Sequence, residues 1–271
     1  MQIKYYKNFK EDKRPSMDQY ANRLITHQSK NYKNHQIDFF QPQLNFFSKL
    51  IFSDSWKMRY ARYMLYPNQI KKLPEHDIAH ICDHQYGNLY PYLNSKLKFI
   101  TVHDLVPLIF QEKLNKNPLL GKFSLSKLKL FTKVFAISKN TKNDIIKFTD
   151  CPEEKIEVIM ESTEDFFDNS SIDKKKICKK YNIPFDKKKI LISGNIFYKN
   201  NDVAYKVLEK LNHIDKNIIF IHIGSGNKNI KISDHLKNYV IKLPFVDKKE
   251  VPNIYKVIDI LFFPSIRSEE H

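Results

Sequence analysis

Short apolar runs alternate along the chain with longer stretches in which apolar residues recur every three or four positions. The short runs are apolar on both faces, as strands of a parallel sheet covered on both sides must be. The predicted strands lie at 2–6, 36–40, 78–82, 98–103, 133–137, 156–160, 189–194, 217–224, 239–243 and 260–264. The amphipathic stretches predict helices near 16–29, 53–72, 140–148, 175–182, 201–212 and 248–257.

The repeated strand–helix–strand order predicts an α/β protein with right-handed crossovers. The stretch 161–175 is acidic and polar without periodicity, so it is the expected linker, with a boundary placed at 166/167. Residues 1–166 and 167–271 are then two doubly wound, Rossmann-like domains. Ligands are expected where the carboxyl ends of the strands face a cleft.

The composition fits a protein of the cytoplasm. The 271 residues are 42% hydrophobic, which is enough to build a core in each domain. No run approaches the eighteen or so apolar residues of a membrane span, and the charged N-terminus lacks the apolar region of a secretion signal. Cys82, Cys151 and Cys178 are too scattered for a disulfide framework or a CxxC metal clip.

The formal net charge of +16 raises the question of an anionic partner. Only five of the 46 basic residues are Arg, the residue best suited to bidentate contacts with phosphates and bases. The Lys excess is spread along the chain. We therefore expect no nucleic-acid partner, while peripheral attraction to anionic lipid headgroups stays open.

One segment imitates a zinc site. His76, His80 and His84 would lie on one face of a helix, beside Cys82, but the run 78–82 is better interpreted as a strand. In a strand, residues four apart are separated by about 13 Å, which is too far for one ion with bonds of ~2 Å. We expect neither a metal nor another cofactor.

Two strand ends carry candidate chemistry. His103 and Asp104 end the strand at 98–103, where His103 either donates a hydrogen bond to a bound polar group or caps the next turn, with Asp104 starting it. Gly194 ends another strand, and a short loop carries Lys199 to a helix start, a combination suited to a diphosphate. Gly224 and Ser225 follow the next strand, at a turn where a ligand meets backbone.

The order of motifs resembles the retaining family 4 glycosyltransferases of the GT-B fold, and the resemblance covers nearly the whole chain. In a bacterial subset of this family, three successive segments resemble RPSMDQYANRLI, MRYARYMLYPNQI and HICDHQYGNLYPYL. The family's central and donor-side motifs are similar to FITVHDL, VFAISKNTKNDIIKF, ISGNIFYKNND, FIHIGSG and LPFVDKKEVPNIYKVIDILFFPS.

The resemblance implies transfer of a sugar from a nucleotide-diphosphate donor to an acceptor hydroxyl with retention, in polysaccharide or lipid-linked glycan synthesis. By position, His103 contacts the transferred sugar and Lys199 holds the diphosphate. The implied catalytic residues are His103, Asp104 and Glu270; the implied donor-binding residues are Ser16, Ser138, Gly194, Asn195, Lys199, Asn200, Gly224, Ser265 and Glu269.

The chain departs from the family pattern in three places. Asn195 stands where many relatives have Arg, and Pro15-Ser16-Met17 replaces a Gly-Gly pair. The family's Glu-x7-Glu motif begins at Glu270 or Glu269, and no second Glu follows. We therefore expect a C-terminally truncated transferase whose second domain is incomplete. A naturally short nucleotide-sugar-binding or scaffold protein without catalysis is the alternative, and a lysine-rich nucleic-acid or membrane binder is the third hypothesis.

Overall fold

The computed structural model describes residues 1–50, 53–114, 119–161, 171–225 and 232–266. Contacts within the chain divide it into two compact units, one formed by residues up to Glu161 and the other by the described residues from 171 on. We call them unit 1 and unit 2. The predicted boundary at 166/167 lies outside the described residues.

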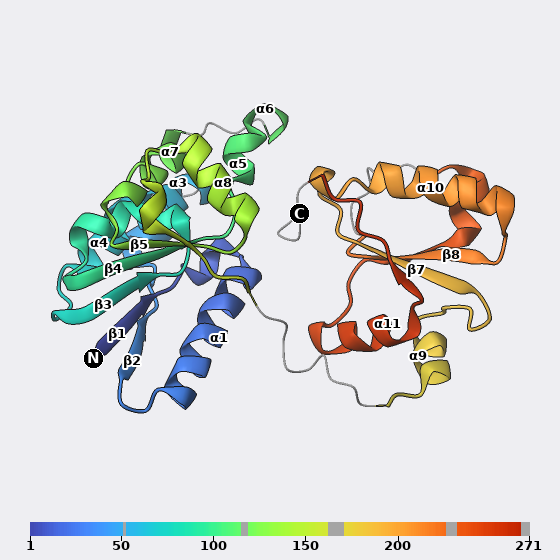
Figure 1. Ribbon diagram of the computed structural model, residues 1–271, viewed down its shortest axis with the longest axis horizontal. Coiled ribbons are helices and arrows are strands. Elements are labelled where there is room, and N and C mark those ends of the chain that lie inside the picture. Colours follow the sequence, from blue (N-terminus) through green and yellow to red (C-terminus); the bar gives the residue numbers. More distant parts are fainter. Residues whose placement is uncertain (51–52, 115–118, 162–170, 226–231, 267–271) are drawn as a thin grey trace. The chain divides into compact units, whose positions relative to one another are not determined.

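Unit 1 is built on a six-stranded parallel sheet with the strand order β2-β1-β3-β4-β5-β6 (Figure 1). The chain adds β2 on one side of β1 and then crosses to add β3 on the other side. The direction of winding therefore reverses between β1 and β3, which makes the carboxyl ends of these two strands a topological switch point. The strands are β1 (Gln2–Tyr6), β2 (Gln36–Phe40), β3 (His76–Ile81), β4 (Ser95–Val102), β5 (Lys133–Ala136) and β6 (Ile156–Val158).

Helices cover both faces of this sheet, since alternate residues of each strand point to opposite sides. Helix α1 packs Ala21 against Ile3 and Ile78 on one face. A larger cluster, which includes Tyr66, Ile100 and Val134, fills the other face. The helices of unit 1 are α1 (Pro15–Asn31), α2 (Phe46–Lys49), α3 (Asp54–Tyr60), α4 (Tyr66–Ile70), α5 (Val106–Ile109), α6 (Gln111–Leu114), α7 (Leu119–Leu125) and α8 (Lys139–Phe148).

The predicted helix at 53–72 changes its winding in the middle. Between α3 and α4, residues Ala61–Leu65 form a π-helical turn. Pro67 has no N–H to give to the carbonyl four residues earlier, so an unbroken α-helical ladder is impossible there. The wider turn keeps Ala61 and Leu65 buried against the sheet.

Unit 2 repeats the plan with a four-stranded parallel sheet in the order β10-β7-β8-β9. Here the winding reverses between β7 and β10. Helix α10 covers one face through Ala204 and Leu208, and α9 and α11 cover the other (Figure 1). The elements are α9 (Lys174–Lys180), β7 (Lys188–Ser193), α10 (Asn201–Ile214), β8 (Ile218–Ile223), β9 (Val240–Leu243), α11 (Val251–Val257) and β10 (Ile260–Leu261).

Every predicted strand has a counterpart in the described residues, with ends shifted by a few positions. The elements absent from the prediction are short and include α2, α5, α6, α7 and a 3-10 helical stretch over His84–Tyr92. One or two turns contain too few positions to establish a 3.6-residue period. Within the described ranges, no helix is both long enough and apolar enough to cross a bilayer.

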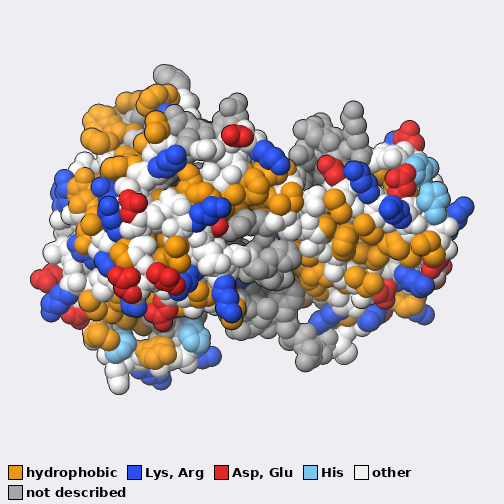
Figure 2. All heavy atoms as spheres, turned by 45° about the horizontal axis from the view of Figure 1, so that its top comes forward, with side chains coloured by type: hydrophobic (Ala, Val, Ile, Leu, Met, Phe, Trp, Pro, Cys, Tyr) orange, Lys and Arg blue, Asp and Glu red, His pale blue; other side chains and the backbone are white. Residues whose placement is uncertain are grey.

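The basic residues are dispersed over the face shown in Figure 2, where Lys and Arg side chains lie among acidic and hydrophobic ones. Several of the described ion pairs are exposed, such as Lys57 with Asp54 and Lys237 with Asp234. A dispersed distribution of this kind differs from the single basic stripe typical of nucleic-acid-binding surfaces.

Candidate functional site

In unit 2, two glycine turns meet at the carboxyl edge of the sheet. Gly194 after β7 and Gly224 after β8 have φ values of 77° and 71°, a backbone region that favours glycine. A Cβ placed on Gly224 would lie 3.6 Å from the Cα atom of Gly194. The two turns are therefore in contact, and no side chain of either residue shields the backbone from a ligand.

Lys199 lies directly beside these turns. A Cβ placed on Gly194 would come within 3.2 Å of the Lys199 Cγ atom, so the side chain packs against the glycine. Its Nζ atom lies 4.5 Å from the centroid of the Phe263 ring, just after β10. The Lys199 ammonium group therefore lies near the ends of both β7 and β10, the two strands that flank the switch point.

Two asparagines fix the start of α10 to the same strand ends. Asn200 has a left-handed backbone with φ of 57°, and its side-chain amide donates to the Pro264 carbonyl oxygen at 3.1 Å. Asn201 donates to the Gly194 carbonyl oxygen at 2.6 Å. The amino end of a 14-residue helix, where unpaired N–H groups favour anions, is therefore anchored at the switch point.

A buried histidine, His222, forms a hydrogen bond with the backbone of Gly194. His222 Nε2 lies 2.7 Å from the Gly194 carbonyl oxygen, and His222 Nδ1 lies 2.6 Å from the Tyr205 hydroxyl. Burial lowers the pKa of His222 and outweighs the opposite effect of the Gly194 carbonyl. A neutral ring donates from Nε2 to the carbonyl and accepts at Nδ1 from Tyr205. Neither residue was found from the sequence, although His222 lies at an inward-facing position of a predicted strand.

Two buried hydroxyl groups lie in the segments that follow β8 and β10. Ser225 and Ser265 are 5% and 7% exposed, and neither hydroxyl has a hydrogen-bond partner among the described residues. An unsatisfied buried hydroxyl costs about 1–3 kcal/mol. Ser225 follows Gly224, and Ser265 follows the carbonyl that Asn200 holds, so both are placed where a bound polar ligand would supply the missing partner.

In unit 1, His103 follows β4 and is 3% exposed. Its Nε2 atom lies 2.9 Å from the Cys82 carbonyl oxygen, and its Nδ1 atom lies 3.0 Å from Glu161 Oε1. The ring of Tyr20 contacts it edge-on at 4.7 Å between centroids. Both ring nitrogens therefore face acceptors, which is the environment of a doubly protonated imidazolium.

Opposing effects act on the pKa of His103. Burial lowers it, but the hydrogen bond to Glu161, the charge of Asp83 and the Cys82 carbonyl together raise it above the ordinary value of 6.5. Only the part of the turn interpretation that concerns Asp104 is confirmed at this strand end. Asp104 starts the next turn by accepting a hydrogen bond from the Val106 N–H at 2.9 Å. His103 itself does not cap that turn, since its ring bonds to Cys82 and Glu161.

The remaining predicted residues lie in different settings. Ser138 is the N-cap of α8: its hydroxyl accepts a hydrogen bond from the Thr141 N–H at 3.1 Å. Ser16 is exposed in the first turn of α1, and Asn195 is half-buried after Gly194. Glu269 and Glu270 lie outside the described residues.

The zinc-like segment forms a strand. His76 and His80 belong to β3, where His80 Nε2 lies 2.8 Å from the Thr101 hydroxyl and His76 Nε2 lies 3.2 Å from the Tyr6 hydroxyl. Burial lowers the pKa of His80 to about 3, so its ring is neutral at ordinary pH. Across the ranges that the structure describes, no three His, Cys, Asp or Glu side chains converge in a metal-binding cluster.

A group of charged side chains with buried carboxylates lies at the switch point of unit 1 and could not be predicted from the sequence. Asp83, two residues after the end of β3, accepts hydrogen bonds from Asn8 at 2.7 Å and from Arg14 at 3.3 Å. Burial raises the pKa of Asp83, but the effects of His84, Arg14 and the hydrogen bonds are together larger and lower this pKa to about 2. Arg62 pairs with the buried carboxylate of Asp12. These ionised groups are therefore fixed in place at the carboxyl edge of the sheet.

Comparisons with known proteins agree with the fold described above. The fold class is α/β with two Rossmann-like units, as in the GT-B glycosyltransferases. Residues 173–271, most of unit 2, match the family model described as Glycosyl transferases group 1. No curated protein matches the chain in sequence.

Several solved glycosyltransferases share the fold. HepE of Anabaena, solved in complex with UDP-glucose, superposes with a TM-score of 0.64 at 12% identity, over 99% of this chain and 75% of HepE. WaaG, a glycosyltransferase involved in lipopolysaccharide biosynthesis, gives 0.64 at 11% identity, over 99% and 76%. A glycosyltransferase from Rickettsia africae gives 0.56 at 19% identity, over 99% and 74%. The prediction of two Rossmann-like domains of GT-B type is confirmed.

Proposed function

We propose that this protein is a glycosyltransferase that moves a sugar from a nucleotide-diphosphate donor to an acceptor hydroxyl. The observation that carries the proposal is the arrangement of Lys199 against Gly194 at the switch point of unit 2. A flexible ammonium group, exposed backbone and a helix start are what a diphosphate requires. The match of residues 173–271 to Glycosyl transferases group 1 supports the same chemistry.

Lys199 is assigned to the donor diphosphate. As the glycosidic bond to the phosphate breaks, negative charge grows on the leaving diphosphate, and a preplaced cation stabilises this charge. Asn195, at the Arg position of the family, adds hydrogen bonds without charge. The backbone N–H groups at the start of α10 supply the remaining anion binding, so we propose that transfer proceeds without a metal or other cofactor.

The donor chosen for testing is UDP-glucose, because HepE was solved with it. We propose transfer with retention of the anomeric configuration, onto a glycan or lipid-linked acceptor in bacterial surface polysaccharide synthesis. The proposed location is the cytoplasm, at the inner face of the membrane. The family resemblance of the motifs supports these finer points, and the anomeric form of the product, observed by NMR, tests retention.

The test of donor binding uses calorimetry on the full chain. Replacing Lys199 by Ala is expected to weaken UDP-glucose binding about tenfold to a hundredfold, since charge-assisted hydrogen bonds contribute about 1.5–3 kcal/mol. Lys206→Ala is the matched control, because it removes the same charge from an exposed position of α10, the helix that follows Lys199. Equal affinities of the Lys199→Ala variant and the unmodified protein, or absence of binding across a panel of nucleotide sugars, would refute the proposal.

A further inference from the structure

A cavity of about 730 Å³ opens at the carboxyl edge of the unit 1 sheet. It lies on the switch-point side, since Arg14 follows β1 and His84 follows β3. We call it the switch cavity. Its described lining includes four cationic side chains, Arg14, Arg59, Arg62 and Lys122, against the single carboxylate of Asp12. The remaining wall is mainly apolar, with leucines from α5, α7 and the turn before α5.

The two inner arginines retain donors for a ligand. A guanidinium carries five N–H donors. Among the described residues, Arg62 uses three of them, two toward Asp12 and one toward Gln85 Oε1 at 3.2 Å. In the same described ranges Arg14 makes a single bond, to Asp83 at 3.3 Å, and its side chain is 35% exposed. The buried carboxylates therefore hold both guanidinium groups in position without using up their hydrogen-bonding capacity.

His84 provides an independent sign of a ligand. It lines the switch cavity and is 7% exposed, and its Nδ1 atom has no hydrogen-bond partner in the described part of the chain. Asp83 Oδ1 lies 3.6 Å from that atom, beyond hydrogen-bonding distance. Burial lowers the pKa of His84 and outweighs the attraction of Asp83 and Asp104. An imidazole Nδ1 donates or accepts a hydrogen bond according to its tautomer, and in either state this atom is buried without a partner among the described residues.

An aromatic cavity of about 750 Å³ adjoins the switch cavity, with Arg59, Tyr63 and Leu120 lining both. Its other walls include Trp56, Tyr60 and Met64. The Arg59 guanidinium lies over the Trp56 ring at 5.0 Å, which joins the cationic region to the aromatic one. An anionic group in the first cavity would therefore have an apolar neighbour in the second.

We propose that these two cavities bind a phosphate-bearing acceptor, with the phosphate at Arg14, Arg62 and His84 and an apolar chain against Trp56 and Tyr60. Arginine forks match phosphate oxygens in pairs, and the aromatic wall buries the attached hydrocarbon. Assigning this ligand to the acceptor of a sugar transfer rests on the proposed function. The cavities themselves define the chemistry, an amphipathic phosphate monoester or diester.

Trp56 is the only tryptophan in the chain, so its fluorescence reports directly on the aromatic cavity. Octyl phosphate is the probe, with octyl glucoside and inorganic phosphate as comparisons, all on the full chain. Octyl phosphate is expected to shift Trp56 emission to the blue with at least tenfold tighter binding than either comparison. Binding of octyl glucoside or of inorganic phosphate with equal affinity would overturn the proposal, because it requires both parts of the ligand.

Three variants locate the phosphate. Arg14→Gln and His84→Gln are each expected to weaken octyl phosphate about tenfold, as loss of one charge-assisted or buried hydrogen bond does. Lys122→Gln, at an exposed position, is expected to weaken it about threefold and serves if an inner variant fails to fold. Lys96→Gln, at the opposite edge of the sheet, is the control. Unchanged affinity in every folded variant of the cavity would refute the phosphate site.

UDP-glucose binding by the same variants separates this proposal from the proposed function. The cavity variants are expected to bind UDP-glucose as the unmodified protein does, because Lys199 and its neighbours are untouched. If the protein binds octyl phosphate but no nucleotide sugar, the sugar-transfer assignment fails and the phosphate site stands. If the protein binds nucleotide sugars, and its affinity for octyl phosphate is the same in the Arg14, His84 and Lys122 variants as in the unmodified protein, only the phosphate-site proposal is refuted.

Discussion

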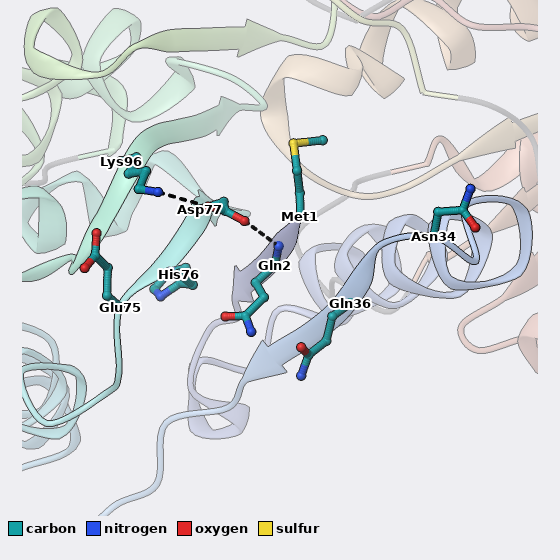
Figure 3. Close-up of a pocket in the computed structure, with 8 residues that line it drawn as sticks. All are labelled: Met1, Gln2, Asn34, Gln36, Glu75, His76, Asp77 and Lys96. Carbon is teal, nitrogen blue, oxygen red and sulfur yellow. Dashed lines mark hydrogen bonds and ion pairs between the residues drawn. The ribbon is translucent and has the colours of Figure 1, made fainter.

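The two edges of the unit 1 sheet carry charged residues in opposite ways. At the carboxyl edge, the carboxylates of Asp12 and Asp83 are 1% and 0% exposed and are bound by arginines. At the amino edge, Asp77 lies between the Lys96 ammonium at 3.6 Å and the Gln2 backbone N–H at 2.9 Å (Figure 3). That ion pair is 70% and 37% exposed, and it lines an open pocket of about 460 Å³.

This difference shows which charges require an explanation. Exposed pairs contribute about 0–1 kcal/mol and are tolerated almost anywhere on a surface. Burying an ion pair carries a desolvation cost that its attraction often fails to repay, so stability alone does not account for one. The carboxyl edge holds two ion pairs with fully buried carboxylates around a cavity, and it is also where an α/β sheet binds its ligands. We interpret these pairs as a ligand-binding arrangement and the amino edge as ordinary surface.

The largest expected effect comes from breaking a buried pair. Arg62→Met leaves the Asp12 carboxylate buried without its cation and should lower the free energy of unfolding of unit 1 by about 3–5 kcal/mol. Lys96→Met, which breaks the exposed pair at the other edge, should change it by less than about 1 kcal/mol. Urea unfolding followed by Trp56 fluorescence measures both, since Trp56 reports on unit 1. Equal effects of the two variants would remove the distinction between the edges.

The second expected effect depends on pH and concerns His103. Because its folded-state pKa lies above 6.5, the protonated ring stabilises the fold fully at pH below 6.5, and this contribution is lost as the pH rises through the raised value. His103→Gln should therefore cost about 1.5–3 kcal/mol at acidic pH and less at alkaline pH. Unfolding free energies of both proteins from pH 5 to pH 9 give the comparison. A cost that is constant or grows with pH contradicts a protonated His103.

The smallest expected effect extends the comparison to the carboxyl edge of unit 2. Ser225→Ala and Ser265→Ala remove buried hydroxyls that have no described partner, so each should leave stability unchanged or raise it by about 1 kcal/mol. Each should also weaken UDP-glucose about fivefold. Thermal unfolding and calorimetry on the same samples measure the two effects. Serines that stabilise the fold and do not affect donor affinity would be structural residues.

Much of the fold could be predicted from the sequence because each strand of a covered parallel sheet is a continuous apolar run. The proximity of Gly194, Lys199 and Gly224 in unit 2 could also be predicted, since all three lie within a few residues of such runs. The charges of unit 1 could not. Arg62 and Asp12 are 50 positions apart, and Arg14 and Asp83 are 69 apart, so only packing brings them together. From the sequence, His84 belongs only to the zinc-like pattern of His76, His80 and His84.

His103 illustrates a different limit. The sequence placed it correctly at the end of a strand, where a ligand contact and a structural contact are equally compatible with the pattern. The partners of its ring, the Cys82 carbonyl and Glu161, come from another strand end and from 58 positions downstream. A histidine at the end of an apolar run therefore indicates where the side chain lies in the sheet. The hydrogen-bond partner of each ring nitrogen depends on residues distant in the sequence and could not be predicted.

The central claim is that the carboxyl edges of both sheets are ligand sites. Amide NMR spectra of the isotope-labelled full chain, recorded with UDP-glucose and separately with octyl phosphate, test it most directly. The account predicts that UDP-glucose shifts the amides of Gly194, Lys199, Gly224 and Ser265, and that octyl phosphate shifts those of Arg14, His84 and Trp56. Shifts confined to Gln2, Asp77 and Lys96 at the amino edge, or no shifts with either ligand, would contradict it.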